Sequence, residues 1–460
     1  MNNMTDILLV TINAKWIHPS LALRLLKANL GILEDRCEIA EFTLRQNMEE
    51  KINLILAARP KILGISVSVW NHLATLELLR GLHKGWAAQE RSGIERPAVI
   101  LGGPEISFLP PDSEIFRYSD YCIRGEGEFA FRALCEAVLL KKNIDIKDDL
   151  YEVNLADIKS AYRLYTDEDL SKKLIYVESS RGCPFGCEFC QSAFRKGLTS
   201  RVREFQLEPF FAEMEDLINR GAKILKFLDR SFNINIDRAC QIMEFFLEKI
   251  EEGSFLVVHF EMVPSQFPSK LLDTIARFPP GTLRLEIGIQ TLNPIVSGII
   301  SRQVDYEQIL SNLYFLGKKT NAIIHADLIA GLPGEDLASF AAGFDMLFGA
   351  LSASAAVEIQ LGILKLLPGA PIARHSGMKC NPLPPYELIE TAEIPAFELD
   401  RIKNFARFWE LIINRKLFDI GKAPVFKRFM ALSDHLINCF GRSWGIPKKD
   451  LLEAVNSLLR

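Results

Sequence analysis

The chain has 460 residues, of which 48% are hydrophobic and 24% charged, and its formal net charge is −4. This is the balance of a globular protein too long for one ordinary core, so we expect two or three domains. No long Lys/Arg run marks a nucleic-acid surface, and the most apolar stretch, 350–372, contains Glu358 and Lys365, which exclude a membrane span. Without a signal pattern at its start, the chain is expected to be cytoplasmic, with nine reduced cysteines.

Residues 1–145 alternate between strand-like and helix-like segments. Apolar runs of strand length, which suit parallel strands buried on both faces, occur five times: 6–13, 37–42, 62–69, 98–102 and 121–124. Helical patterns separate these runs, and a last one covers 128–140. This alternation predicts a doubly wound α/β domain with a parallel sheet, in which a ligand binds at the carboxyl ends of the strands.

The expected strand ends of this first domain carry residues that suit a binding site. Gly102 and Gly103 would let a ligand approach the backbone, and the hydroxyls of Ser66 and Ser68 are available to hydrogen-bond it. Each residue taken alone is better explained as a turn or a packing residue, but four such strand ends together predict a site. Its candidate residues are Asn13, His18, Ser66, Ser68, Trp70, Gly102, Gly103, Glu105, Gly125 and Glu126.

A second run of alternating strands and helices follows a polar segment at 146–172, which we interpret as a linker or a short helical bridge. Within 173–375 six strands are expected: 174–178, 224–228, 255–260, 283–287, 323–329 and 357–364. Six β–α units suit an open partial barrel, related to the eight-fold barrel whose chemistry lies at the carboxyl ends of its strands.

A cysteine-rich loop, Arg181-Gly-Cys-Pro-Phe-Gly-Cys-Glu-Phe-Cys190, follows the first of these strands and spaces Cys183, Cys187 and Cys190 as C-x3-C-x2-C. Iron–sulfur clusters are held by cysteine thiolates, usually four for each cubane. Three thiolates without a fourth would leave one iron open to a substrate. The alternative is a structural zinc site, but such sites need four ligands, and 136–239 contains no further Cys or His. The spacing therefore favours a 4Fe-4S cluster.

This loop resembles the signature of radical S-adenosylmethionine (SAM) enzymes. The resemblance implies that SAM chelates the open iron through its amino and carboxylate groups and that Phe189 packs near the adenine. It also implies that residues at the strand ends of the partial barrel border SAM: Asp229, Glu261, Gln290, Leu332 and Pro333. From the residues alone, each acid is equally well explained as a helix cap or an ion-pair partner.

The N-terminal strand ends resemble the cobalamin-binding domain of many radical SAM proteins. In that domain a serine after the third strand and a Gly-Gly pair after the fourth line a slot for the nucleotide tail of cobalamin. The usual D-x-H-x-x-G signature is absent, and Lys15-Trp-Ile-His-Pro-Ser20 takes its place. Although His18 is chemically competent as a metal ligand, we expect the tail to lie away from cobalt with no histidine replacing it.

Residues 376–460 are expected to form a small helical domain beside the barrel, with helices at 398–417, 424–440 and 448–459. An aromatic stripe is expected to bury one side of the first helix: Phe397, Ile402, Phe405, Phe408 and Leu411. The whole chain resembles a subgroup of cobalamin-binding radical SAM proteins that end in a domain of unknown function.

The resemblance implies an enzyme. The cluster would cleave SAM reductively to methionine and a 5′-deoxyadenosyl radical, the radical would take hydrogen from an unactivated carbon, and cobalamin would deliver a methyl group there. Two alternatives stay open: a cobalamin-assisted radical oxidation or rearrangement, and a corrinoid- or redox-sensing protein without turnover. The expected partners are a small-molecule or peptide substrate and a reducing protein such as flavodoxin or ferredoxin, with neither nucleic acid nor membrane.

Overall fold

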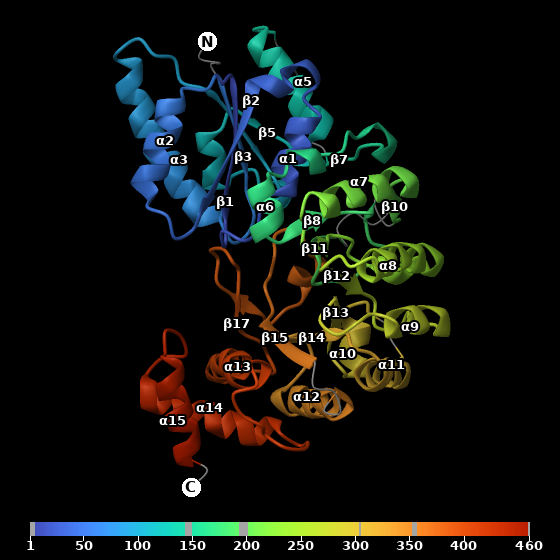
Figure 1. Ribbon diagram of the computed structural model, residues 1–460. Coiled ribbons are helices and arrows are strands. Elements are labelled where there is room, and N and C mark those ends of the chain that lie inside the picture. Colours follow the sequence, from blue (N-terminus) through green and yellow to red (C-terminus); the bar gives the residue numbers. More distant parts are fainter. Residues whose placement is uncertain (1–4, 143–149, 193–200, 303–304, 352–356, 459–460) are drawn as a thin grey trace. The chain divides into compact units, whose positions relative to one another are not determined.

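The computed structural model describes residues 5–142, 150–192, 201–302, 305–351 and 357–458. Contacts within the chain divide it into two compact units (Figure 1). The first comprises Met1–Ser179 and Arg203–Lys226, and the second comprises Ser180–Val202 and Phe227–Arg460. The division into segments 1–145, 146–172, 173–375 and 376–460 stays a prediction, because compactness alone does not define a domain.

The first unit contains a five-stranded parallel sheet in the order β2-β1-β3-β4-β5. The strands are β1 (Ile7–Asn13), β2 (Cys37–Thr43), β3 (Ile62–Ser66), β4 (Ala98–Gly102) and β5 (Tyr121–Cys122). This is a doubly wound order in which the direction of winding reverses between β1 and β3, and ligands bind in the crevice outside the strand ends at that point. Thr11 and Ser66 are register partners there.

Helices cover both faces of this sheet, as the continuous apolar strands predict. Figure 1 shows α2 (Met48–Ala58) and α3 (His72–Glu90) on one side and α1 (Leu21–Ala28) and α5 (Glu128–Leu139) on the other. Successive residues of β1 point to opposite faces. Leu8, Val10 and Ile12 join the core under α2 and α3, whereas Ile7 and Leu9 join the core with α1 and α5.

The described part of the expected linker, 150–172, is folded and belongs to the first unit. It contains β7 (Leu150–Tyr151), the single turns η3 (Leu155–Asp157) and η4 (Tyr162–Leu164), and α6 (Asp167–Lys172). The buried Arg24 guanidinium binds the carboxylates of Glu41 at 2.9 Å and Asp169 at 2.8 Å. This ion-pair network fastens α6 to α1 and β2.

A second sheet has the order β15-β14-β13-β12-β11-β8, and its strands β12 to β15 pair in parallel. Its strands are β8 (Ile175–Val177), β11 (Ile224–Phe227), β12 (Val257–Met262), β13 (Leu283–Gln290), β14 (Ile323–Ala330) and β15 (Val357–Ile363). The helices of the second unit alternate with its strands: α8 (Ile236–Glu251), α9 (Ser269–Ala276), α10 (Pro294–Ile299), α11 (Tyr306–Lys319) and α12 (Leu337–Leu351). The α/β architecture expected from the sequence is confirmed.

Strand β13 shows how the sheet of the second unit separates an apolar from a polar face. Leu283, Leu285, Ile287 and Ile289 are buried, and the residues between them are only half buried. Figure 1 shows α8, α9 and α11 along one side of these strands. The apolar residues therefore serve the helix-covered core, while the alternating polar residues line the opposite face, where a site can form.

The last part of the second unit is helical, with α13 (Ala396–Trp409), the π-helical turn η8 (Glu410–Asn414), α14 (Phe426–Phe440) and α15 (Lys448–Leu458). Aromatic rings of Phe344, Phe405, Trp409 and Phe426 pack against one another there. The expected burial of Phe397 was wrong, because that side chain is 63% exposed. The sequence also missed a short antiparallel pair, β16 (Lys379–Cys380) with β17 (Leu388–Glu390). Among the described residues, no helix combines the length and apolarity that a membrane crossing requires.

Candidate active site

The cysteine loop begins directly after the short strand β9 (Ser180–Arg181). Gly182 has φ of 100°, a conformation that glycine adopts without strain. The Cys190 amide donates to the Cys187 carbonyl at 3.0 Å and closes a tight turn between these two ligand candidates. All three cysteines are free thiols; Cys187 is 6% exposed, and Cys183 and Cys190 are half buried.

The three thiols lie close enough to influence one another electrostatically. Burial raises the pKa of Cys183, and the nearby thiols of Cys190 and Cys187 raise it further. Within the described residues, no three His, Cys, Asp or Glu side chains are grouped as ligands of one metal ion. In a cubane each thiolate bonds a different iron, so its ligands lie farther apart than those around one zinc ion. The loop supplies three cysteine thiols, one ligand fewer than a closed zinc site needs.

Glu188, between two of the cysteines, anchors the loop to the rest of the second unit. Its buried carboxylate accepts a hydrogen bond from the Ser301 hydroxyl at 3.1 Å, pairs with Arg374, and lies 2.7 Å from Nε2 of His375. Its main chain bonds Ile300 and Ile372 at 3.0 Å and 2.9 Å. The sequence analysis missed Glu188, although an acid inside an otherwise apolar motif is a usable signal for a buried ion pair.

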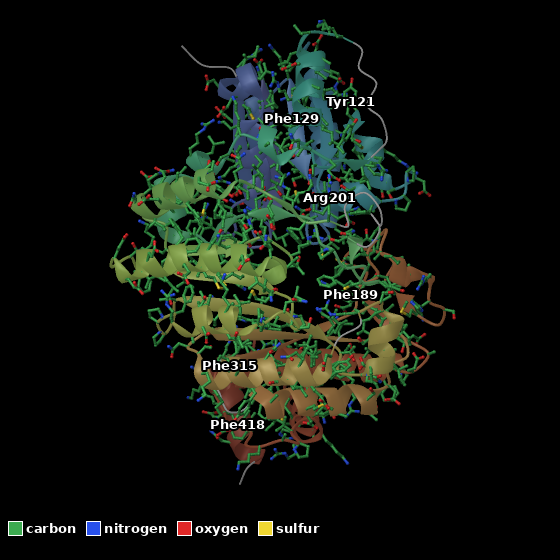
Figure 2. The ribbon with its side chains drawn as sticks, turned by 90° about the vertical axis from the view of Figure 1, so that its right-hand side faces the viewer. Tyr121, Phe129, Phe189, Arg201, Phe315 and Phe418 are labelled. Carbon is green, nitrogen blue, oxygen red and sulfur yellow. The ribbon has the colours of Figure 1, made fainter. Side chains whose placement is uncertain are left out.

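Asp229 supports the start of the same loop. Its carboxylate is 2% exposed and accepts a hydrogen bond from the Ser180 hydroxyl at 2.6 Å. Phe189, in the same loop, is half buried. Figure 2 shows it well apart from Phe418, which lies in the helical part of the second unit. The described contacts thus give Asp229 a positioning role, while its predicted contact with SAM stays a prediction.

Acids and histidines share one level of the polar sheet face. Glu261 and Glu286 are register partners, as are Glu286 and His325, and His325 and Glu358. His259 Nε2 lies 3.2 Å from a Glu286 oxygen, and His325 Nδ1 lies 3.2 Å from a Glu358 oxygen. The hydrogen bond with His325 lowers the pKa of Glu358. The structure thus groups Glu261 with two histidines that the sequence analysis did not select.

The ends of β13 and β14 carry the remaining candidates of the second unit. Gln290 has φ of 72°, next to a register shift in β13. Leu332 and Pro333 are buried, and their contact with SAM stays a prediction. Glu335, which follows them, accepts a hydrogen bond from Thr291 at 2.6 Å, and burial raises its pKa to about 7.

In the first unit, the winding reversal between β1 and β3 is built around Asn71. Its amide donates to the Ile12 carbonyl at 3.0 Å, and its side-chain oxygen accepts from the Ser68 amide at 2.8 Å. This buried residue, which the sequence analysis missed, fixes the loop after β3 against the end of β1. Ser66 and Ser68 therefore stand at the place where this sheet order binds ligands.

Gly102 and Gly103, at the end of β4, differ in the space beside them. A Cβ atom on Gly103 would lie 2.6 Å from the Val67 carbonyl oxygen, so the loop after β3 approaches the backbone too closely for any side chain. A Cβ atom on Gly102 would meet nothing closer than 3.6 Å. Trp70 beside them is 55% exposed. This backbone-lined edge with an exposed aromatic fits a large flat ligand such as cobalamin.

Several predicted cobalamin residues already have partners within the first unit. His18 Nδ1 lies 2.9 Å from the Tyr176 hydroxyl, and burial with the nearby Lys15 lowers the pKa of His18. Glu105 lies 2.8 Å from His72. Further contacts are Asn13 with Glu41 at 3.1 Å, Gly125 with Ser107 at 2.9 Å, and Glu126 with Arg203 and Val153. These bonds give the residues structural roles, and their contact with cobalamin stays a prediction.

Comparison with known families decides the assignment. Residues 177–347 match the model of the radical SAM superfamily, and residues 7–135 match that of the B12 binding domain. Together these ranges cover well over half of the chain. The chain is a cobalamin-binding radical SAM protein. The expected cofactors, a 4Fe-4S cluster, SAM and cobalamin, are those of this family, and the cysteine loop lies inside the radical SAM range.

Curated relatives of this radical SAM protein include methyltransferases. An uncharacterized methyltransferase of Pyrococcus horikoshii is 26% identical over 265 residues, which are 52% of this chain and 55% of the relative. The cobalamin-dependent radical SAM methyltransferase TokK of Streptomyces tokunonensis is 24% identical and aligned over 68% of this chain and 48% of its own. The chain spans about half the length of these curated relatives.

Solved structures share the fold. TsrM of Kitasatospora setae, a radical SAM methyltransferase, aligns with 83% of this chain and 79% of its own, with TM-score 0.60 and 18% identity. OxsB, a cobalamin-dependent SAM radical enzyme, aligns with 98% of this chain and 79% of its own, with TM-score 0.67 and 13% identity. At these identities the likeness establishes the fold alone.

Proposed function

We propose that this radical SAM protein is a cobalamin-dependent methyltransferase that methylates an unactivated carbon. The observation that carries the proposal is the joint presence of a three-cysteine loop and a B12 binding domain in one chain. The methyltransferases among its relatives support the choice of methyl transfer over a cobalamin-assisted oxidation or rearrangement. A sensor is less well supported, because sensing needs no iron that is open to SAM.

The residues of the chain would divide the work as follows. Cys183, Cys187 and Cys190 hold the cluster, and Glu188 keeps their loop in place. Gly102 and Gly103 line the edge where cobalamin binds. The bound cofactors supply an electron, a radical that removes hydrogen from carbon, and a methyl carrier. The protein has to orient the substrate carbon and exclude water from it.

We further propose a small-molecule or peptide substrate and a flavodoxin- or ferredoxin-type reductant. A cytoplasmic location belongs to the same proposal, because three free thiols must stay reduced until iron binds them. Neither nucleic acid nor membrane is part of the proposal.

The first test addresses the cluster. Cys183→Ala, Cys187→Ala or Cys190→Ala is expected to abolish reductive SAM cleavage, because each removes an obligate thiolate. Cys439→Ala, which changes an exposed thiol, is the matched control and should cleave SAM at the wild-type rate. A reconstituted wild-type chain that takes up only zinc and shows no broad visible absorption would contradict the cluster.

The second test addresses methyl transfer. The reduced holoenzyme is given SAM with a trideuterated methyl group and an extract of the source organism. A product that carries the labelled methyl, with 5′-deoxyadenosine and S-adenosylhomocysteine in similar amounts, supports the proposal. Steady 5′-deoxyadenosine without S-adenosylhomocysteine would favour oxidation or rearrangement instead.

A further inference from the structure

Arg302, three residues beyond α10, reaches the cysteine loop. Its Nη1 donates to the Sγ of Cys187 at 3.3 Å, and its Nη2 donates to the Gly288 carbonyl. The main chain of Arg302 is held as well. Its amide donates to the Ser297 carbonyl at 2.9 Å, and the Ser297 hydroxyl donates to the Arg302 carbonyl. Both ends of this arginine are therefore fixed before any cluster binds.

The carbonyl that holds the guanidinium belongs to a bulge of β13. The register with β14 shifts between Gly288 and Gln290, and Gln290 has φ of 72°. A Cβ atom on Gly288 would lie 2.5 Å from Nε2 of Gln290, so a larger residue there would displace the Gln290 side chain. Bulges redirect the local backbone and are frequent beside active sites. This bulge presents the Gly288 carbonyl to Arg302.

Arg302 has no carboxylate partner among the described residues. Glu188, the acid next to Cys187 in the loop, is bound by Ser301, Arg374 and His375 instead. The Nε of Arg302 is buried without a hydrogen-bond partner in the described part of the chain. Since a half-buried guanidinium needs a counter-charge, the sulfur of Cys187 is the group that the structure offers it.

We propose that Arg302 is a positioning residue for the cluster, which donates a hydrogen bond to the Cys187 thiolate and raises the cluster's reduction potential. Hydrogen bonds to the sulfurs and nearby charge set the potentials of iron–sulfur clusters. Reduction adds one electron from an external donor and breaks no bond, and a fixed positive charge favours the more negative product. The inference rests on the cluster of the proposed function and extends it to a residue outside the cysteine motif.

The test uses the full chain, reconstituted with iron and sulfide and without SAM. The cluster is titrated with dithionite at controlled potential, and the electron paramagnetic resonance signal of the reduced form is followed. Arg302→Gln is expected to lower the equilibrium constant for reduction roughly tenfold, which is about 59 mV for one electron. Arg302→Lys, which keeps the charge but loses the two-pronged fork, should give an intermediate value.

Arg277→Gln is the control, because Arg277 pairs with Glu244 at the surface of the same unit and should leave the potential unchanged. Iron content shows that each variant is loaded. A loaded Arg302→Gln variant with the wild-type potential would overturn the proposal, even if its SAM affinity fell. If that variant binds no iron, Arg302→Lys decides: a wild-type potential there overturns the proposal as well. Failure of the wild-type chain to form a cluster would instead contradict the proposed function.

Discussion

Two adjacent glycines at the end of β4 differ in whether the backbone there tolerates a side chain. Gly103 has φ of 103° and ψ of 174°, a region essentially limited to glycine. Gly103→Ala is expected to lower the free energy of unfolding by on the order of 1–3 kcal/mol, and the contact with Val67 adds to this loss. Gly102→Ala, whose Cβ meets only ordinary contacts, should fold normally. Urea unfolding of the two cobalamin-free variants checks the difference, and equal stabilities would contradict this reading of the turn.

Glu335 makes the stability of the second unit depend on pH. Burial raises its pKa from 4.5 to about 7, so the folded chain holds a proton that the unfolded chain releases between these values. The free energy of unfolding therefore falls as pH rises through this window, by on the order of 3 kcal/mol. Glu335→Gln should remove this part of the fall.

The measurement for Glu335 is urea unfolding of the wild type and of Glu335→Gln at pH 5 and pH 8. The variant is expected to lose less stability than the wild type between the two. Glu307→Gln changes an exposed acid of α11 and is the control. Parallel pH profiles for the wild type and Glu335→Gln would show that the carboxyl does not titrate in this range.

At the scale of elements, local pattern was sufficient wherever a segment keeps one periodicity. The expected strand at 98–102 has the observed bounds of β4, and the expected helix at 128–140 is observed as α5, Glu128–Leu139. Strand β13 extends to Gln290, three residues beyond its predicted end, because Gly288 and Gln290 form a bulge rather than a terminus. The β16–β17 pair was missed because the prolines of 382–385 indicate a connector, and only contacts with the rest of the unit reveal strands beside it.

The N-terminus of helix α14 is capped by a side chain from another helix. No side chain of its own caps it, and Asp345 of α12 accepts hydrogen bonds from the Val425 and Phe426 amides at 2.5 Å and 2.8 Å. Asp345→Ala should destabilise the chain by about 1–2 kcal/mol, because two amides lose an acceptor and the helix dipole loses a favourable charge.

Thermal unfolding of Asp345→Ala checks that cap. Asp273→Ala, which removes an exposed acid from α9, is the control and should change the stability little. If both variants unfold at the same temperature, Asp345 does not act as the cap of α14.

At the scale of the whole molecule, Arg24 fastens a distant segment of the chain to the N-terminal sheet domain. It joins α1 to α6 across 145 positions of sequence, and its side chain is 6% exposed. Arg24→Met should cost about 3–5 kcal/mol, because it leaves the Glu41 carboxylate without its cation and the buried Asp169 carboxylate with Lys173 alone. Arg163→Met is the matched control: Arg163 joins the same segment to Glu34, but at the surface, so its loss should cost less than about 1 kcal/mol.

Limited proteolysis of the segment 150–179 distinguishes the two variants. Arg24→Met is expected to expose this segment to cleavage, whereas Arg163→Met leaves it protected. Rapid cleavage of the wild type would show that the segment is a flexible linker after all.

The candidate site was predictable only where its chemistry is contiguous in sequence. The cysteine spacing and the Gly102–Gly103 pair are local signals, and both could be selected as candidates from the sequence. The sequence did not reveal the roles of Asn71, Glu188, Arg302 and the His259–His325 pair, because only the fold brings these residues to their partners. A common residue type outside any motif does not indicate a site until the strand register shows which residues are its neighbours.

The Glu188 anchor also sets an order of assembly during synthesis. Its side-chain partners Ser301, Arg374 and His375 lie 113, 186 and 187 positions further along the chain. Since chains emerge from the ribosome N-terminus first, the three cysteines are made long before the residues that hold their loop. Iron delivered early would meet an open, unanchored loop. Stable insertion of the cluster must therefore wait until translation has passed residue 375, which makes the redox centre a late step in the maturation of this protein.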